Sequence, residues 1–128
     1  MSVDLADTEW AYMAGFVDAD GCISANTRPT WTNYYPRLSI SQVTPDYLEF
    51  MRDLFKGNLR HRKPSGVGRN MIWNLQIPSG GTRMALAGML PFLRYKRPQA
   101  EIALIITGHP KAEELCRELA ALKRSHAR

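Results

Sequence analysis

Residues 10–17 constrain the fold most, because every one of them is apolar, aromatic or glycine. Asp7 is expected to cap a helix here and Gly21 to stop it, which predicts a helix from residue 7 to about residue 20. A helix that is apolar on all sides must be covered on all sides. The chain therefore needs packing partners for more than one face of this helix.

Two faces of the predicted helix differ in the size of their side chains. Trp10, Met13 and Val17 share one face, which can pack on a sheet. Another face carries small residues at four-residue spacing, which allow close approach of a second backbone: Ala11, Gly15 and Ala19. The chain has no second helix of this kind. The sequence therefore predicts a homodimer in which this face is the dimer interface and packs on its twin.

Asp18 and Asp20 lie at the wrong end of this helix for its dipole. Acids at a helix C-terminus are disfavoured, typically by about 0.3–1 kcal/mol each. In a two-fold dimer the two helix ends would meet, and their carboxylates and end carbonyls would form an oxygen-rich site suited to Mg²⁺ or a similar cation. The alternative is that both acids only shape the turn into Gly21.

The rest of the chain predicts an α+β fold. Strands are expected over residues 22–30, 35–42, 59–63 and 69–77, and helices over 44–57, 82–90, 98–107 and 111–123. Thr44 is a predicted cap of the second helix, with Pro45 at its first position. The order αββαββα, followed by extra C-terminal helices, favours one four-stranded, mostly antiparallel sheet. We expect residues 1–128 to form a single domain.

The charge distribution indicates a polyanionic partner. The net charge is +5, and no acidic residue lies between Asp20 and Asp46 or between Asp53 and Glu101. About half of the basic residues in these segments fall on predicted strands, interleaved with tryptophan and tyrosine. This combination favours nucleic acid over the alternative of a merely solvated basic face.

No feature of the sequence indicates a membrane or an oxidising compartment. No apolar run is long enough to span a bilayer, and the acidic N-terminus is unlike a signal peptide. Cys22 and Cys116 have neither pair nor ligand spacing. We expect an intracellular protein without a membrane partner. Bacterial or phage-infected cytoplasm and an organelle stay open as its location.

The stretch "MAGFVDADG" at residues 13–21 resembles the LAGLIDADG motif of homing endonucleases. Both acids, both glycines and both alanines match, and Met13, Phe16 and Val17 are apolar exchanges. The order αββαββα is also similar to that family, so the resemblance extends to about residue 108. With one motif, the chain is similar to the homodimeric, intron-encoded members. The resemblance implies a metal-dependent endonuclease that hydrolyses double-stranded DNA at a long, near-palindromic site.

The resemblance also implies roles for residues around the motif. Asp20 matches the metal ligand, the carbonyl of Ala19 assists it, and Asp18 matches a structural acid. The implied cofactor is Mg²⁺, for which other divalent cations can substitute. The metal would activate a water molecule and stabilise the leaving oxygen.

Two further residues match family positions near the site. Gln42 in "SISQVT" matches a glutamine at the end of the second strand, although it could instead help to cap the next helix. Lys96 in "LRYKRPQA" matches a lysine that polarises the site or its water, although an ordinary surface lysine is the alternative. With Asp20, they form the implied catalytic set.

The resemblance implies that the sheet lies in the DNA major groove, which an antiparallel ribbon fits. Residues expected to point toward DNA are Ser24, Asn26, Arg28, Arg37, Ser39, Arg60, Arg62, Asn70, Ile72 and Asn74. Arginine suits guanine edges and asparagine suits adenine edges. Whether the helix over residues 111–123 packs on the core or contacts DNA stays open.

Two other functions remain compatible with the sequence. The same fold could serve an intron RNA maturase or a catalytically inactive DNA-binding protein. The presence of Asp20, Gln42 and Lys96 argues against degeneration but does not exclude a second activity. A small basic scaffold protein with a coincidental motif is a further alternative.

Overall fold

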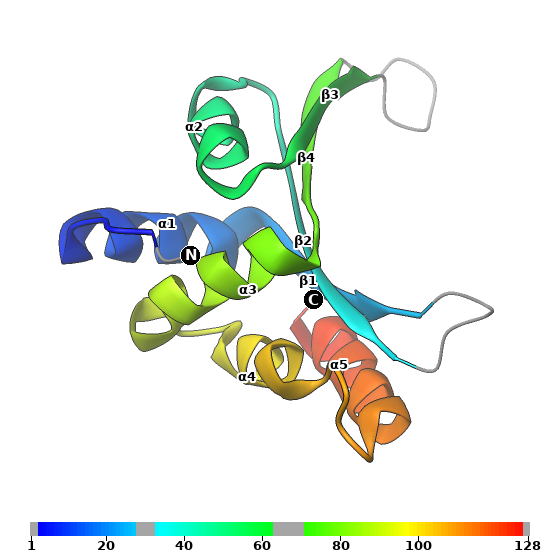
Figure 1. The fold of residues 1–128 in the computed structure, drawn as a ribbon. Helices are drawn as coiled ribbons and strands as arrows, with labels where there is room; N and C mark the ends of the chain where they lie inside the picture. The colour runs from blue at the N-terminus through cyan, green and yellow to red at the C-terminus, as the bar shows by residue number, and fades with distance from the viewer. Residues whose placement is uncertain (1–2, 28–32, 63–70, 127–128) are drawn as a thin grey trace.

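The computed structural model of the chain describes residues 3–27, 33–62 and 71–126. Its elements are α1 (Asp7–Asp20), β1 (Gly21–Asn26), β2 (Tyr35–Gln42), α2 (Asp46–Phe55), β3 (Asn58–Arg62), β4 (Ile72–Ile77), α3 (Ser79–Met89), α4 (Arg97–Ile105) and α5 (Ala112–His126) (Figure 1). A short 3-10 helix, η1 (Leu90–Phe92), links α3 to the segment before α4. The predicted order αββαββα, with further helices after it, is confirmed.

The four strands form one sheet in the order β1-β2-β4-β3. Every neighbouring pair is antiparallel, as the sequence predicted for most of the sheet. Ile23 pairs with Leu38, and Leu38 pairs with Ile77, so these three side chains share one face. All three are fully buried, which identifies this face as the side that packs on the core.

The opposite side chains of the strands form a second, polar face. We call it the outer face, and its residues are Cys22, Ser24, Asn26, Tyr35, Arg37, Ser39, Ser41, Asn58, Arg60, Arg62, Ile72, Asn74 and Gln76. Figure 1 shows α1, α2, α3 and α4 on the other side of the sheet. Within the described residues, no helix lies over the outer face in that view, so the sheet is half-covered.

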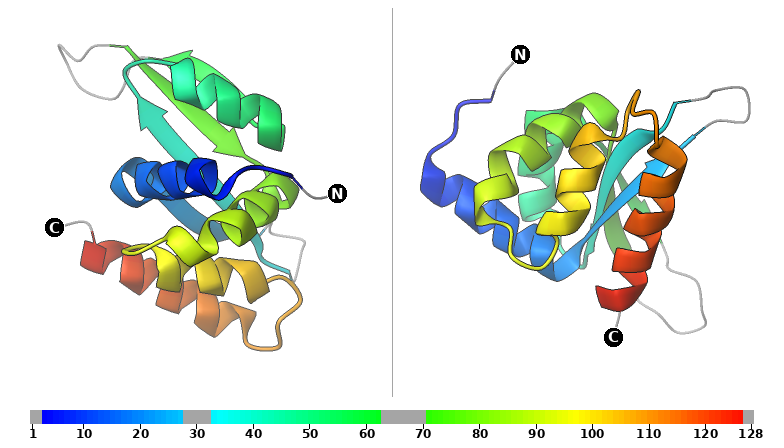
Figure 2. Two further views of the ribbon diagram at one scale, coloured as in Figure 1. Left: turned by 90° about the vertical axis from the view of Figure 1, so that its left-hand side faces the viewer. Right: turned by 90° about the horizontal axis from the view of Figure 1, so that it is seen from below.

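Helix α5 packs on the protein core. It lies along the edge strand β1 and beside α4 (Figure 2). Ala112 and Leu119 of α5 are buried, and the Cys116 thiol is 3.5 Å from the backbone oxygen of Ala25 in β1. The open question about this helix is thereby answered in favour of packing.

The predicted helix caps are wrong by one position. Ala6 is the N-cap of α1 and Pro45 is the N-cap of α2, and neither forms a side-chain capping hydrogen bond. Asp7 and Asp46 are instead the first residues of their helices, where a carboxylate interacts favourably with the helix dipole. The end of α2 falls at Phe55, slightly before the predicted end.

Gly21 stops α1, but by close packing and not by a left-handed turn. Its backbone is extended, with φ −82° and ψ 157°, and it is the first residue of β1. A Cβ atom on Gly21 would lie 2.8 Å from Val17 Cγ1 and 2.9 Å from the Val17 oxygen. Glycine is therefore needed because the strand leaves the helix without any clearance for a side chain. The described part of β1 is shorter than predicted and ends at Asn26.

Candidate active site and nucleic-acid interface

Asp20 is the last residue of α1, and its carboxylate is exposed. The helix begins where Asp7 and Glu9 fill its first turn, and its buried residues Met13 and Val17 fix it on the sheet. Since β1 begins at the next residue, the Asp20 backbone is held by regular structure on both sides. The backbone from which the Asp20 carboxylate extends is therefore held in place at the end of an apolar helix.

Gln42 approaches Asp20 from the end of β2. The Gln42 side-chain nitrogen Nε2 donates a 2.6 Å hydrogen bond to Asp20 Oδ2. The alternation of β2 places Gln42 on the helix-covered face with Leu38 and Ile40, and its side chain is half-buried. The structure thus brings together two of the three residues of the implied catalytic set.

Asp18 binds the segment that precedes α4. Its Oδ2 accepts a 2.8 Å hydrogen bond from the Arg94 backbone N–H, and its Oδ1 accepts one of 2.9 Å from the Lys96 backbone N–H. Both carboxylate oxygens of Asp18 are therefore occupied within the chain. This geometry fits the structural role that the motif implies for Asp18 and leaves Asp20 as the available acid of the helix end.

Lys96 lies at the same helix end. Its Nζ donates a 2.7 Å hydrogen bond to the Asp18 backbone oxygen, and the residue is half-buried. The last carbonyls of a helix have no partner inside the helix and carry partial negative charge, so an ammonium group there is favourable. Lys96 thereby offsets part of the cost of two acids in the last turn of α1.

One chain supplies an incomplete set of metal ligands. The described residues contain no group of three or more His, Cys, Asp or Glu side chains that could hold a metal ion. Asp20 offers a carboxylate, and Ala19 offers a carbonyl of the last helical turn. These hard oxygen donors suit Mg²⁺, which accepts few protein ligands. They would become a shared site only if a second helix end approached.

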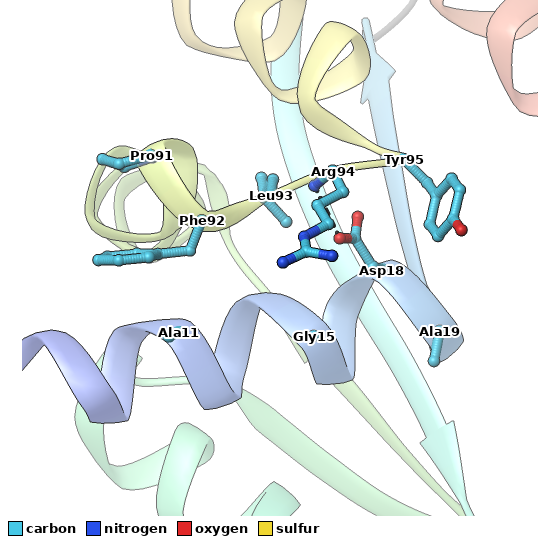
Figure 3. A pocket seen from close by; sticks show the side chains of 9 residues that line it. All are labelled: Ala11, Gly15, Asp18, Ala19, Pro91, Phe92, Leu93, Arg94 and Tyr95. Carbon is cyan, nitrogen blue, oxygen red and sulfur yellow. Dashed lines mark hydrogen bonds between the residues drawn. The ribbon is translucent and has the colours of Figure 1, made fainter.

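The small-residue face of α1 is open in the chain. Ala11, Gly15 and Ala19 are exposed, and a Cβ atom on Gly15 would have no neighbour within 4 Å. This face forms one wall of a pocket of about 540 Å³, which Figure 3 shows between α1 and the segment before α4. Its lining residues are Ala11, Gly15, Asp18, Ala19, Pro91, Phe92, Leu93, Arg94 and Tyr95.

On its other side, the open face of α1 adjoins an aromatic cluster shared with α2. Tyr47 contacts the rings of Tyr12, Phe16 and Phe50, with ring centroids 4.9, 5.0 and 5.5 Å away. Its hydroxyl donates a 3.0 Å hydrogen bond to Glu9 Oε2. Burial raises the pKa of the Tyr47 hydroxyl well above its usual range, and the bond to the Glu9 carboxylate raises it further. Sequence reasoning missed this cluster.

The outer face carries all the predicted DNA-contacting residues that the structure describes. The strand register places Ser24, Asn26, Arg37, Ser39, Arg60, Arg62, Ile72 and Asn74 on it together. Arg28 and Asn70 lie outside the described residues. Sequence reasoning missed Gln76, although the alternation of β4 groups it with Asn74. It also missed that Asn74 is only 9% exposed.

Comparison with proteins of known sequence finds a relative among DNA endonucleases. The chain is 34% identical over 108 residues to the DNA endonuclease I-CvuI of Chlorella vulgaris. The match covers 77% of this chain and 63% of that protein, so the chain spans less than two thirds of its relative's length. No family model matches the chain.

Comparison with solved structures gives similar results. The homing endonuclease I-CvuI, in complex with its target and Ca, has a TM-score of 0.62 and 28% identity, and the match covers 94% of this chain and 80% of that chain. A second structure of I-CvuI, with Mg and uncleaved DNA, gives the same TM-score. The LAGLIDADG meganuclease I-AabMI, bound to uncleaved DNA, has a TM-score of 0.60 over 91% of this chain and 44% of that chain. At 19% identity, this last likeness shows the fold alone.

Among the described residues, no helix has the length and the apolar character needed to cross a bilayer.

Proposed function

We propose, on the premise that the chain has the LAGLIDADG homing-endonuclease fold and is a homologue of these enzymes, that it is a site-specific endonuclease acting on double-stranded DNA. The observation that carries this proposal is the exposed Asp20 carboxylate at the end of the motif helix, held by Gln42. A DNA substrate implies an intracellular site of action.

The functional unit in this proposal is a two-fold homodimer, and residues 1–128 form one half of it. The open face of Ala11, Gly15 and Ala19 has no partner side chains around Gly15 within the described chain. A twin α1 could approach this face closely because it has no bulk. Two-fold symmetry would pair the helix ends and give a near-palindromic target.

A divalent cation completes the proposed site, and Mg²⁺ is the ion we infer. Asp20 and the Ala19 carbonyl of each chain would hold it at the paired helix ends. When bound, such an ion supplies an activated water molecule and stabilises the leaving oxygen in phosphodiester hydrolysis. The hard oxygen donors favour this class of ion.

The other two residues of the proposed catalytic set have distinct tasks. Gln42 fixes the direction of the Asp20 carboxylate, because its amide donates to one of the two oxygens. Lys96 keeps a positive charge at the helix end through its bond to the Asp18 carbonyl, beside the place where the scissile phosphate would lie. Its backbone N–H, bound to Asp18, sets where that charge is held.

The outer face is the proposed DNA-binding surface. It carries Arg37, Arg60 and Arg62 among small polar residues, and α1, α2, α3 and α4 lie on the other side of the sheet. Arginine and amide side chains can read base edges, and a two-stranded ribbon fits the major groove. The Asp20 site lies where α1 meets β1 and where β2 ends, so it borders the edge of the outer face.

One experiment tests this function. A randomised duplex library is incubated with the protein, and the bound and the cleaved molecules are sequenced separately, with and without Mg²⁺. We expect one long, near-palindromic site that is bound in both conditions and cut only with the cation. Selective binding without cutting would favour the inactive DNA-binding alternative, and a preference for structured intron RNA would favour a maturase.

A further inference from the structure

Four polar side chains form a continuous hydrogen-bonded network across the outer face. Arg37 Nη1 donates to Gln76 Oε1 at 3.5 Å, and Gln76 Nε2 donates to Asn74 Oδ1 at 3.4 Å. Asn74 Nδ2 then donates to Ser41 Oγ at 2.9 Å. This network therefore crosses between β2 and β4 twice, near the middle of the sheet.

The chemistry of its first member sets the direction of every bond. A guanidinium group has only donors, so Arg37 holds the Gln76 oxygen toward itself. This turns the Gln76 amide nitrogen toward the Asn74 oxygen, and that in turn directs the Asn74 nitrogen to Ser41. An amide without such a neighbour can present either end. Here the orientation of both amides follows from one charged group.

The fixed orientation of the two amides determines which donors and acceptors the network leaves free for a ligand. Arg37 keeps further N–H groups, Gln76 keeps one N–H, and the Ser41 hydroxyl keeps its own proton because its oxygen accepts from Asn74. The Gln76 oxygen already accepts from Arg37. A free glutamine reads adenine by donating and accepting at once, whereas guanine presents two acceptors in the major groove. A surface of spare donors therefore suits guanine.

Asn74 differs from the other three members in its accessibility. It is only 9% exposed, whereas Arg37, Ser41 and Gln76 are exposed. Ser41 of β2 and Arg60 of β3 lie opposite it on the two neighbouring strands. Its amide is bonded on both sides, so it has little capacity left for DNA. Its chemistry fits a residue that orients its neighbours.

We propose that Arg37 and Gln76 act as one coupled recognition unit that selects a guanine in the target, and that Asn74 is the positioning residue that holds the amide nitrogen of Gln76 in place. This inference rests on the proposed function and adds which outer-face residues work together. The alternative is a surface on which the side chains act independently. Each side chain would then add its own contribution to base preference at its own base.

The test is a double-mutant cycle read out as base preference. The wild type, Arg37→Ala, Gln76→Ala and the double variant are each used to select bound duplexes from a randomised library. We expect both single variants to lose guanine preference at the same base position. The fold-losses should not multiply in the double variant, and should fall short of the product by about fivefold or more. The pair Arg62 and Gln76, which have no mutual contact, is the matched control and should give multiplying losses at different positions.

Asn74 is tested with two variants. Asn74→Leu removes both bonds, so only the 3.5 Å bond from Arg37 still holds the Gln76 amide, and guanine preference at that position should weaken. Asn74→Asp keeps the acceptor for Gln76, and the Ser41 hydroxyl can donate to it. It should retain guanine preference although its negative charge lowers affinity for all DNA.

Three outcomes would overturn the inference. Multiplying losses for Arg37 and Gln76, at separate base positions, would make them independent readers. Equal loss for every sequence would assign Arg37 to a phosphate. A wild-type protein with no base preference anywhere would overturn the proposed function itself, which the wild-type selection alone reveals.

Discussion

Gln42 and Asp20 are joined by a 2.6 Å hydrogen bond between the end of β2 and the end of α1. Asp20 is exposed, and Gln42 binds only one of its two carboxylate oxygens. A carboxylate that is fixed at one oxygen and open at the other is preorganised for a cation, because little orientation remains to be lost on binding.

Replacing Asp20 separates cleavage from binding. Asp20→Asn keeps the shape and still offers an oxygen to Gln42, but removes the charge that would anchor the metal. We expect cleavage at background level at any Mg²⁺ concentration, with target affinity equal or higher, measured by plasmid nicking and by gel shift. The fold should be at least as stable without metal, because an acid at a helix C-terminus is relieved. Asp53→Asn, an exposed acid on α2, is the control. Near-normal cutting by Asp20→Asn would refute the metal site.

Replacing Asp18 should affect stability more than chemistry. Asp18→Asn can accept from only one of the Arg94 and Lys96 backbone N–H groups and faces the other with its own amide. Losing such a charge-assisted bond should lower the free energy of unfolding by about 1.5–3 kcal/mol, measured by urea denaturation. Cleavage should fall less than in Asp20→Asn. Abolished cleavage at unchanged stability would instead make Asp18 a ligand.

Gly15→Leu tests the dimer. A Cβ atom at Gly15 meets nothing within 4 Å, so the single chain has room for the leucine. We expect sedimentation to show monomer in place of dimer, with cleavage lost. The control is Gly88→Ala, whose Cβ would collide with the Trp10 ring. That variant should lose about 1–3 kcal/mol of stability through overpacking. A Gly15→Leu protein that stays dimeric would place the interface elsewhere.

The raised pKa of Tyr47 predicts that the protein loses stability in alkaline solution. Its pKa in the folded protein lies above the value of about 10 for an unfolded chain. As the pH rises, the unfolded state therefore loses this proton first. The contribution of Tyr47 to the free energy of unfolding is constant below about pH 10 and decreases above it. Tyr47→Phe cannot ionise, and its melting temperature should fall less steeply than that of the wild type between about pH 9.5 and 11.5. Parallel curves for the two proteins would show that Tyr47 is not responsible.

The pairing of Asp20 with Gln42 was predictable because each element carries its own signal. A motif defines the helix end, and the alternation of β2 assigns Gln42 to the helix-covered face. The hydrogen bonds that Asp18 accepts from the Arg94 and Lys96 backbone join residues more than 70 positions apart, and no local pattern specifies which atoms meet. The resemblance could assign Asp18 a structural role without revealing its partners.

Other errors have local causes. Asp7 lies one position after the N-cap of α1 and Thr44 one position before the N-cap of α2, because side-chain propensity locates a helix end only to within a residue or two. Tyr47 and Phe50 lie beside the buried stripe of α2, so the helical periodicity of the sequence does not single them out. Gln76 follows the same alternation as Asn74, and its significance appears only with its hydrogen bonds to Arg37 and Asn74.

The direct passage from Asp20 to Gly21 has a consequence for how this chain can evolve. Since helix and strand meet without an intervening residue, adding or removing one residue there would invert β1. Ile23 would then turn to solvent and Ser24 to the core. Substitutions on the outer face require no such change. In the proposed function, point mutations on that face can therefore change the target, while the length of the chain at this junction has to stay fixed.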